Sequence, residues 1–313
     1  MIPETSDEVI VVGGGVVGLT TAVVLAEAGR RVAVWTREPA EETTSAVAGG
    51  LWWPYRIEPE RLVGAWALET LAVYEELAER PGETGVRLVD GVHQGARLDG
   101  LGDWAGRVPG LRAVPDGLAA RLPVIDMPTH LAWLRERLVR AGGTVVLREV
   151  ADLAEVPADV VVNCSGLGAR SLAEDASVRP VRGQLVVVEN PGVDTYYTSV
   201  DHSSPVAAYF IPQPYGLILG GTAQEGDWSS EPDPDTAAEI IARCARVRPE
   251  IAGARVLAHK VGLRPYRDAV RLERQSLPGG RTVVHSYGHG GAGVTVAWGC
   301  AREAAGLVPD PAA

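Results

Sequence analysis

Cysteine and lysine are scarce in this chain, and both scarcities narrow the chemistry open to it. The three cysteines, Cys164, Cys244 and Cys300, are far apart and show no CxxC spacing, which argues against a disulfide framework or a cysteine zinc site. The six histidines suggest no metal site either. Lys260 is the single lysine, so an anion site must use arginine or backbone N–H groups.

Long hydrophobic runs and excess positive charge are also absent. No apolar run approaches the ~20 residues that span a bilayer, and the acidic first residues, MIPETSDE, are not typical of a signal or transit peptide. The formal net charge of −11 argues against nucleic acid or an anionic membrane as a partner, since both attract basic surfaces. We therefore expect a cytoplasmic protein that acts on small molecules. The sequence does not give the oligomeric state, and a homodimer stays open.

Glycine is concentrated in two stretches, the first of which lies near the N-terminus. A GxGxxG pattern follows a β-branched run at 9–12 and opens a helix-forming run at 16–28. The strand expected at 31–35 completes a βαβ unit. In such a unit the glycines form a tight turn, let backbone approach a pyrophosphate and let helix and strand pack closely, while the helix N-terminus offers free N–H groups. The residues that we expect to bind the cofactor here are Gly13, Gly15, Val16, Val17 and Gly18.

The end of the second strand carries two residues that bear on the choice of dinucleotide. Glu38 is the nearest carboxylate for ribose hydroxyls. Arg37 is placed to stack on adenine or to meet a phosphate. Because a 2′-phosphate needs a cation, Arg37 keeps NADP open as a rival at this point.

The second glycine-rich stretch is HSYGHGGAGVTVAWG, from His285 to Gly299, and an apolar helix-forming run at 294–307 overlaps its end. A turn of this kind before a helix N-terminus suits a flat or anionic group held against bare backbone. A simple nicotinamide enzyme does not need it. The N1–C2=O edge of a flavin gains negative charge on reduction, and a helix N-terminus stabilises that charge. Two such motifs, one near each end of the chain, therefore predict FAD.

The order of the expected elements indicates a mixed α/β fold. A chain of 313 residues, 46% of them hydrophobic, is long enough for about two domains. The dinucleotide-type elements are split along the chain, with antiparallel, aromatic-bearing segments between them. We predict a discontinuous Rossmann-like FAD-binding domain from 1–50, 125–177 and 259–313, and an antiparallel-sheet substrate domain from 51–124 and 178–258.

With these residues assembled, the chain resembles the family of FAD-dependent D-amino-acid and D-aspartate oxidases. The segments that carry the likeness, in the order found in that family, are VVGGGVVGLT, TTSAVAGGLWWPY, ADVVVNCSGLGA, RPVRGQ, YFIP, GLRPYR and HSYGHGGAGVTVAWGCA. The resemblance implies non-covalent FAD and oxidative deamination of a D-amino acid to a 2-oxo acid, ammonia and hydrogen peroxide, with hydride transfer from Cα to flavin N5 and dioxygen as oxidant. No general base is expected, because hydride transfer needs only a neutral amine in near-attack geometry.

The resemblance also implies roles for individual residues. Arg264 clamps the substrate carboxylate, Tyr209 adds a hydrogen bond to it, and the carbonyl of Gly291 receives the amine. Trp53 is a candidate wall of the substrate pocket. Further cofactor contacts are assigned to Thr43, Thr44, Ser45, Gly50, Leu51, Val150, Ser165, Gly290, Gly291, Ala292, Gly293, Val294 and Thr295.

Two positions depart from the family pattern. Trp53 stands where the family has glutamine, and Pro205 stands where the vertebrate lid has a second tyrosine. The lid between Tyr196 and Tyr209 contains no Arg or Lys, which favours neutral or apolar D-amino acids, although Arg56 is able to enter from another loop. A glycine/sarcosine-type or acidic D-amino-acid oxidase, a flavin-binding sensor without turnover and an NADP-dependent dehydrogenase stay open as alternatives.

Overall fold

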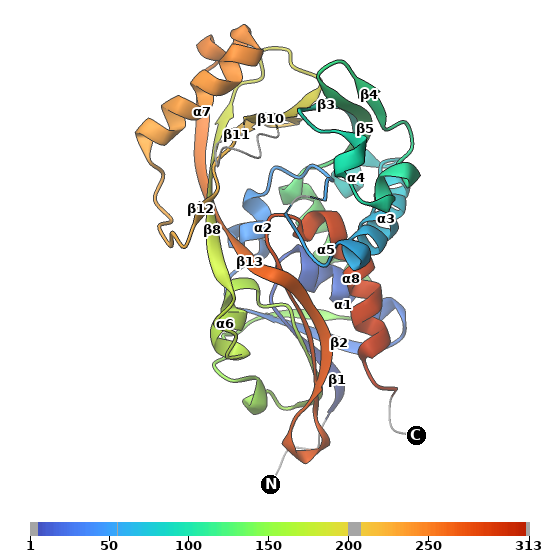
Figure 1. Ribbon diagram of the computed structural model, residues 1–313. Helices are drawn as coiled ribbons and strands as arrows, with labels where there is room; N and C mark the ends of the chain where they lie inside the picture. The colour runs from blue at the N-terminus through green and yellow to red at the C-terminus, as the bar shows by residue number, and fades with distance from the viewer. Residues whose placement is uncertain (1–5, 55, 200–207, 311–313) are drawn as a thin grey trace.

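The computed structural model describes residues 6–54, 56–199 and 208–310. Within these ranges, one sheet runs through the whole molecule, in the strand order β4-β5-β3-β9-β10-β11-β8-β13-β14-β7-β1-β2-β6, with β12 paired to β8. Figure 1 shows the two ends of this sheet as the two halves of an elongated molecule. One half is parallel and the other mainly antiparallel.

The parallel half is built from short apolar strands, and all but the edge strand at 144–147 are largely buried, as expected for strands covered by helices. Its order is β14-β7-β1-β2-β6, and every neighbouring pair is parallel. The strands are β1 (Ser6–Val12), β2 (Arg31–Thr36), β6 (Thr144–Leu147), β7 (Ala158–Asn163) and β14 (Thr282–His289). The helices on one face are α1 (Val16–Glu27), α5 (Met127–Arg140) and α8 (Gly293–Leu307).

The other half has an inner face, which carries Tyr209, Ile211 and Ile218, and an apolar outer face. Helix α7 (Pro234–Val247) covers the outer face, where Phe210, Leu217 and Leu219 pack against Ile240 and Cys244. The strands are β3 (Val86–Gln94), β4 (Arg112–Val114), β5 (Gly117–Ile125), β8 (Arg179–Val188), β9 (Tyr196–Ser199), β10 (Tyr209–Gln213), β11 (Gly216–Gly220) and β12 (Gln224–Glu225). All pairs are antiparallel except β3–β9.

Strand β13 (Val256–Ser276) joins the two halves. Its first part pairs with β8 and its second part with β14. A single strand therefore carries the chain from the antiparallel half into the parallel half. The sequence pattern predicts extended chain only as far as Tyr266. The strand continues because its second part completes a long hairpin with β14.

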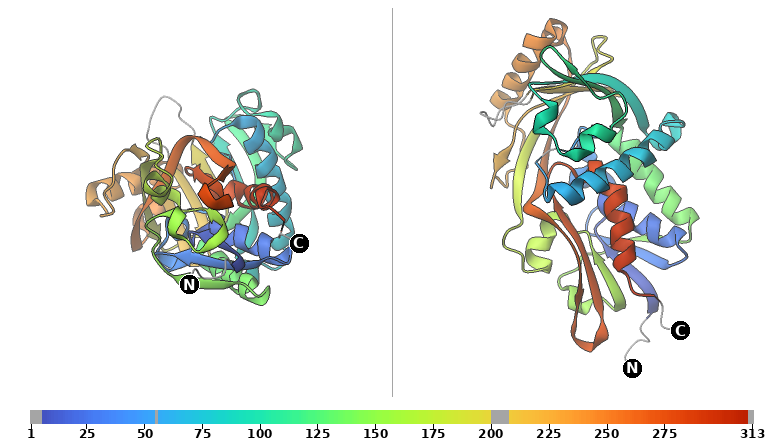
Figure 2. Two further views of the ribbon diagram at one scale, coloured as in Figure 1. Left: turned by 90° about the horizontal axis from the view of Figure 1, so that it is seen from below. Right: turned by 45° about the vertical axis from the view of Figure 1, so that its right-hand side comes forward.

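Helix α3 (Glu60–Leu77) links the halves on the other side of the molecule. It lies against α8, and the right-hand view of Figure 2 shows the two helices side by side. A Cβ added at Gly299 would lie 2.3 Å from Cα of Trp66, so only glycine allows this approach. No helix in the described ranges is long and apolar enough to cross a membrane.

The remaining elements are short. The short α-helices are α2 (Thr44–Val47), α4 (Pro81–Thr84) and α6 (Ala169–Leu172). The 3₁₀ turns are Ala40–Glu42, Leu98–Gly100, Asp103–Arg107, Leu153–Glu155, Gly166–Gly168, Pro249–Gly253 and Pro278–Gly280. The mixed α/β fold predicted from the sequence, with a Rossmann-like parallel part and an antiparallel part, is confirmed.

Candidate cofactor and substrate site

The carboxyl ends of the parallel strands meet at one edge of the sheet, which is where ligands bind in open α/β folds. Gly13 follows β1, Glu38 follows β2, Ser165 follows β7 and Gly290 follows β14. The two glycine-rich stretches from opposite ends of the chain therefore lie at the same edge, as the sequence predicts for a dinucleotide site.

The first turn needs its glycines for contacts within the protein. Gly13 has a φ of +118°, and a Cβ there would lie 2.4 Å from the carbonyl oxygen of Cys164. A Cβ at Gly18 would lie 2.0 Å from the carbonyl oxygen of Gly13. Gly15 is the N-cap of α1, and the next N–H, that of Val16, donates to Ser45 Oγ at 2.9 Å. Ser45, which we expect to contact the cofactor, therefore lies at this turn.

The second turn brings a second helix N-terminus to the first. A Cβ at Gly293 would lie 3.6 Å from Cγ2 of Val17, so α8 and α1 begin side by side. Neither N-cap residue, Ala292 or Gly15, provides a side-chain cap. Apart from the Val16 N–H, which donates to Ser45, the N-terminal N–H groups of the two helices receive no cap from their N-cap side chains, and with a turn of bare backbone they fit a dinucleotide with an anionic pyrophosphate and a flat ring.

The sequence pattern predicts a strand only over 282–285 before the second turn, and the observed strand is longer. β14 extends through Gly288 to His289, because His289 pairs with Tyr266 of β13, so the turn begins at Gly290. His289 is buried and its Nε2 has no partner among the described residues. Burial lowers the pKa of His289 to about 4, so the ring is neutral at ordinary pH.

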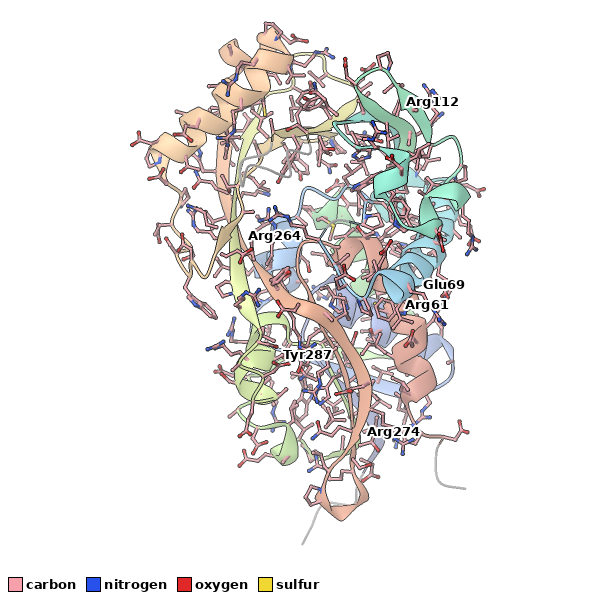
Figure 3. All side chains as sticks on the ribbon, in the orientation of Figure 1. Arg61, Glu69, Arg112, Arg264, Arg274 and Tyr287 are labelled. Atoms are coloured by element: carbon pink, nitrogen blue, oxygen red, sulfur yellow. The ribbon has the colours of Figure 1, made fainter. Side chains whose placement is uncertain are left out.

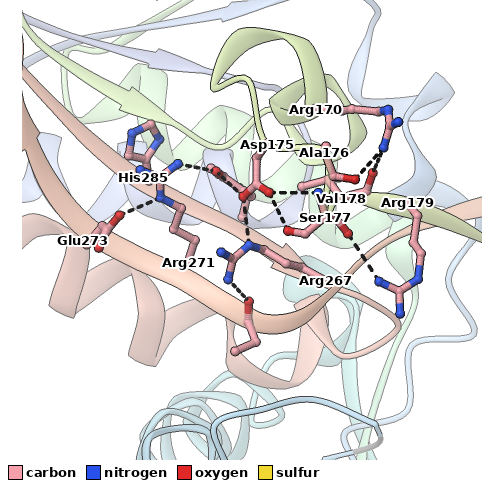
Figure 4. Close-up of polar contacts among 12 residues, drawn as sticks. Arg170, Asp175, Ala176, Ser177, Val178, Arg179, Arg267, Arg271, Glu273 and His285 are labelled. Carbon is pink, nitrogen blue, oxygen red and sulfur yellow. Dashed lines mark hydrogen bonds and ion pairs between the residues drawn. The ribbon is translucent and has the colours of Figure 1, made fainter.

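A polar network stabilises β14 just before the turn (Figure 4). Asp175 accepts hydrogen bonds from Arg267 and from the hydroxyl of Tyr287, both at 2.9 Å, and also from Ser177. Burial acts to raise the pKa of Asp175, but these hydrogen bonds outweigh burial and hold the pKa well below its usual range. Arg267 also packs against Gly288, because a Cβ added at Gly288 would lie 2.7 Å from the Cβ of Arg267.

The loop around α2 lies between β13 and the edge of the sheet where the parallel strands end. Thr43 is buried, and its hydroxyl donates to the carbonyl of Ala40 at 2.7 Å. Thr44 donates to the carbonyl of Leu263 at 3.2 Å. Gly50 has a φ of +79° and pairs through its carbonyl with Ile125. The hydroxyls of both threonines therefore have partners inside the protein. The next residue, Leu51, forms a bridge to Val124.

The end of β2 carries the residues predicted to select the dinucleotide. Arg37 and Glu38 form an exposed ion pair at 3.3 Å. Arg148, which the sequence did not point to, lies over the ring of Trp35 at 3.9 Å. Val150 packs with Trp35 in the same apolar cluster. The charge of Arg37 is balanced by its neighbour, so this end of the site suits ribose hydroxyls better than a 2′-phosphate.

Arg264 lies on β13 at the junction of the two halves (Figure 3). It is half-buried, and its Nη1 donates to the carbonyl of Thr222 at 3.0 Å. A Cβ at Gly183 would lie 2.3 to 2.5 Å from the guanidinium atoms, and one at Gly291 would lie 3.2 Å from Cδ of Arg264. No carboxylate in the described ranges pairs with Arg264. A half-buried guanidinium that lies flat on glycine can bind an incoming carboxylate through two N–H groups.

Tyr209 lies on the same face of the sheet as Arg264. A Cβ at Gly220, its partner on β11, would lie 2.2 to 2.7 Å from the Tyr209 ring and hydroxyl. A Cβ at Gly49 would lie 3.7 Å from Cε2 of the same ring. Gly183 and Gly220 thus leave room for the two side chains that the sequence assigns to the substrate carboxylate.

Trp53 lies beside the second turn. Its backbone N–H and carbonyl are both bonded to the hydroxyl of Thr295, at 3.3 and 3.1 Å. Its ring stacks on His93 with centroids 3.7 Å apart and meets Trp104 edge-on at 5.2 Å. The hydroxyl of Thr295 is therefore bonded to Trp53. Thr295 lies in the first turn of α8 and has only its backbone left to contact a cofactor.

Some parts of the predicted site are arranged differently or lie outside the described residues. The backbone carbonyl of Arg56 lies 3.8 Å from a Cβ built at Gly290, while the residue as a whole is exposed. Pro205 lies outside the described residues. The roles of Gly183, Gly220, Thr222 and His93 were not predicted. Glycine inside a strand was the available signal, because it often marks a close approach.

The histidines and cysteines that the structure describes form no metal site. In the described part of the chain, no three His, Cys, Asp or Glu side chains gather around a common point. His285 and His289 are four residues apart, but they lie on a strand, and His285 is bonded to Gln275 at 2.8 Å. Cys164 is buried and unpaired, and burial raises the pKa of its thiol to about 12.

The sheet, the two glycine turns and the two uncapped helices define a flavin-dependent oxidoreductase. The chain belongs to the family of FAD dependent oxidoreductases, whose sequence pattern matches residues 8–307. The predicted cofactor, FAD rather than NADP, is thereby confirmed.

Individual relatives narrow the family further. The chain is 68% identical to the D-amino-acid oxidase of Streptomyces coelicolor over 97% of each chain, and 50% identical to that of Rubrobacter xylanophilus over 95% of this chain and 94% of the other. The crystal structure of glycine oxidase from Geobacillus kaustophilus shares the fold, with a TM-score of 0.78 at 21% identity, covering 96% of this chain and 95% of the other.

Proposed function

We propose that the protein is a D-amino-acid oxidase, which converts neutral or apolar D-amino acids to 2-oxo acids, ammonia and hydrogen peroxide. The observation that carries the proposal is Arg264, a half-buried guanidinium that lies on Gly183, beside Gly291, with no carboxylate partner in the described chain. The relatives from Streptomyces coelicolor and Rubrobacter xylanophilus, both named D-amino-acid oxidase, support it.

The chain's own residues orient the substrate. Arg264 binds the substrate carboxylate through two parallel hydrogen bonds and fixes its plane. Tyr209 donates a further hydrogen bond to it, and the carbonyl of Gly291, an exposed residue, accepts one from the amine. A carboxylate and an amine held at fixed points leave the Cα–H bond one direction, so only one enantiomer presents it to the cofactor.

The residues of both glycine turns, together with the loop around Ser45, would hold FAD without a covalent bond. When bound, FAD supplies the two-electron acceptor for the Cα–H bond and passes the electrons to dioxygen. The chain contributes binding and orientation, and no side chain is needed as a general base. We also propose that the predicted boundaries separate a cofactor domain from a substrate domain. One boundary falls inside β13, and another falls just before β8.

The expected substrate is a D-amino acid with a neutral side chain. In the described part of the lid, at 196–199 and 208–209, the chain has no cation to pair with an acidic side chain. An acidic D-amino acid would need Arg56 for this purpose. A glycine- or sarcosine-type oxidase is the second candidate, because the fold of a glycine oxidase is so similar.

Anaerobic mixing with D- and L-amino acids, followed by flavin absorbance, tests the proposal. We expect bleaching with neutral D-amino acids such as D-alanine and D-proline, and none with their L-enantiomers. Preferred bleaching by glycine and sarcosine would identify the second candidate, and preferred bleaching by D-aspartate an acidic oxidase. A spectrum that stays oxidised with every substrate would indicate a flavin-binding protein without turnover and contradict the proposal.

We infer a cytoplasmic location from the composition of the sequence, and a homodimer stays open. Fractionation of cells with an antibody against the protein tests the location. Sedimentation of the FAD-loaded protein at several concentrations tests the oligomeric state.

A further inference from the structure

A row of side chains crosses the inner face of the antiparallel half beside the proposed substrate site. His93 on β3, Thr198 on β9 and Tyr209 on β10 are in register. Residues paired in this way lie on the same face of a sheet, and His93 Nδ1 is 2.7 Å from Thr198 Oγ1. Neighbouring strands are about 4.8 Å apart, so the row places His93 about 10 Å from Tyr209.

Trp53 covers the end of this row. It stacks on His93 with an interplanar angle of 22°, and Trp104 meets it edge-on at 85°. Both backbone groups of Trp53 are bonded to Thr295 of α8, the helix that follows the second glycine turn. The indole therefore stacks on a buried imidazole, while the backbone of the same residue is anchored to the helix that follows the second glycine turn.

His93 is built to stay neutral beneath the indole. It is fully buried, and its Nε2 has no partner among the described residues. Burial lowers the pKa of His93 to about 3. A neutral imidazole and an indole offer no countercharge to an acidic side chain, while a rigid flat wall limits the length of a neutral one.

We propose that Trp53 and His93 form one unit that closes the side-chain end of the substrate site and restricts turnover to D-amino acids with short neutral side chains. This inference rests on the proposed function and adds a size limit and a second residue to it. Trp53 is the wall that the substrate meets. His93 is a positioning residue, because it acts only by holding the indole in place through stacking.

The test compares kcat/KM for D-alanine, D-phenylalanine and D-aspartate in the FAD-loaded wild type and in variants. Trp53→Ala removes the wall, so we expect the ratio of D-phenylalanine to D-alanine to rise by about tenfold or more. His93→Ala leaves the indole without its stacking partner, and the same ratio should rise by a smaller factor. His93→Phe keeps a flat ring under Trp53, and its ratio should stay within about twofold of wild type.

His130 provides a matched control. It is also fully buried, stacks on a tryptophan (Trp133, centroids 5.4 Å apart at 23°) and has an Nε2 without a partner among the described residues. It lies on α5, where its Nδ1 is bonded to the carbonyl of Thr84. His130→Ala should lower the melting temperature as His93→Ala does and leave the substrate ratio unchanged.

FAD content and melting temperature are measured for every variant, so that a folding defect is recognised. The inference is overturned if Trp53→Ala keeps its FAD and a wild-type ratio, or if His93→Ala changes the ratio no more than His130→Ala. It is also overturned if His93→Phe behaves like His93→Ala, since ring stacking would then not be the cause. A wild type that oxidises none of the D-amino acids contradicts the proposed function instead and is recognised before any variant is made.

Discussion

Gly13 and Gly18, in the parallel half of the sheet, lie against backbone, whereas Gly183 and Gly220, in the antiparallel half, lie under side chains. A Cβ at Gly18 would meet the carbonyl of Gly13, and a Cβ at Gly13 would meet that of Cys164. A Cβ at Gly183 or Gly220 would instead meet the ends of Arg264 and Tyr209. Backbone cannot move aside, but the end of a long side chain can. The first pair of glycines is thus required for the fold, and the second pair for the placement of functional groups.

The largest effect is expected from Gly18→Ala. The added methyl group would lie 2.0 Å from a backbone oxygen, so α1 must move away from β1 and the first turn is distorted. We expect protein that retains no FAD and melts at a lower temperature. The absorbance of the purified protein and its thermal unfolding measure this. Gly82→Ala is the control, because nothing lies within 4 Å of the added group. A Gly18→Ala protein that purifies with full FAD would break the comparison.

Arg264→Ala should leave the fold and FAD binding intact and weaken the use of substrate. Loss of one partner of a buried charged pair costs about 2–5 kcal/mol, so kcat/KM should fall on the order of 10²–10³-fold, mainly through KM. Steady-state peroxide release measures it. Arg61→Ala, at an exposed arginine of α3 (Figure 3), should change nothing. A KM for Arg264→Ala close to that of wild type would remove Arg264 from the carboxylate site.

Gly183→Ala sharpens the comparison, because it should impair turnover without loss of cofactor. The added methyl group would lie 2.3 to 2.5 Å from the guanidinium atoms of Arg264, and the arginine relieves the collision by moving. We expect normal FAD content and a loss in kcat/KM of about 10–100-fold, since small misplacements of a positioning group have effects of that size. If this variant loses FAD as Gly18→Ala does, the two groups of glycines do not differ in the way described.

The last predicted effect concerns acid stability and leaves turnover at neutral pH unchanged. Burial lowers the pKa of His130 to about 4, from an unfolded value near 6.5. The unfolded chain therefore binds a proton at a pH where the folded chain does not, so stability is complete above pH 6.5 and falls as the pH drops towards 4. The loss is about 3 kcal/mol for this side chain. Denaturant unfolding of wild type and His130→Leu at pH 7, 5.5 and 4.5 measures it, and the variant should show the smaller dependence on pH. Equal slopes of unfolding free energy against pH in the two proteins would contradict this prediction.

Much of the structure of the parallel half follows from local sequence. The β-branched run before Gly13 forms β1, the next run forms α1, and Gly13 and Gly18 make contacts that only glycine allows. The structure of the antiparallel half was harder to predict. Arg264 could be singled out only from its neighbours in the sequence, and nothing local indicated Thr222, which accepts its hydrogen bond.

The sequence by itself determined the positions of the main helices and strands, the two glycine turns and the class of cofactor, because propensity, hydrophobic pattern and turn chemistry act over a few residues. Only the tertiary structure decided that Gly183 lies under Arg264, Gly220 under Tyr209 and His93 under Trp53. Those contacts depend on strand register between segments far apart in the chain, and register is set by the packing of the whole sheet.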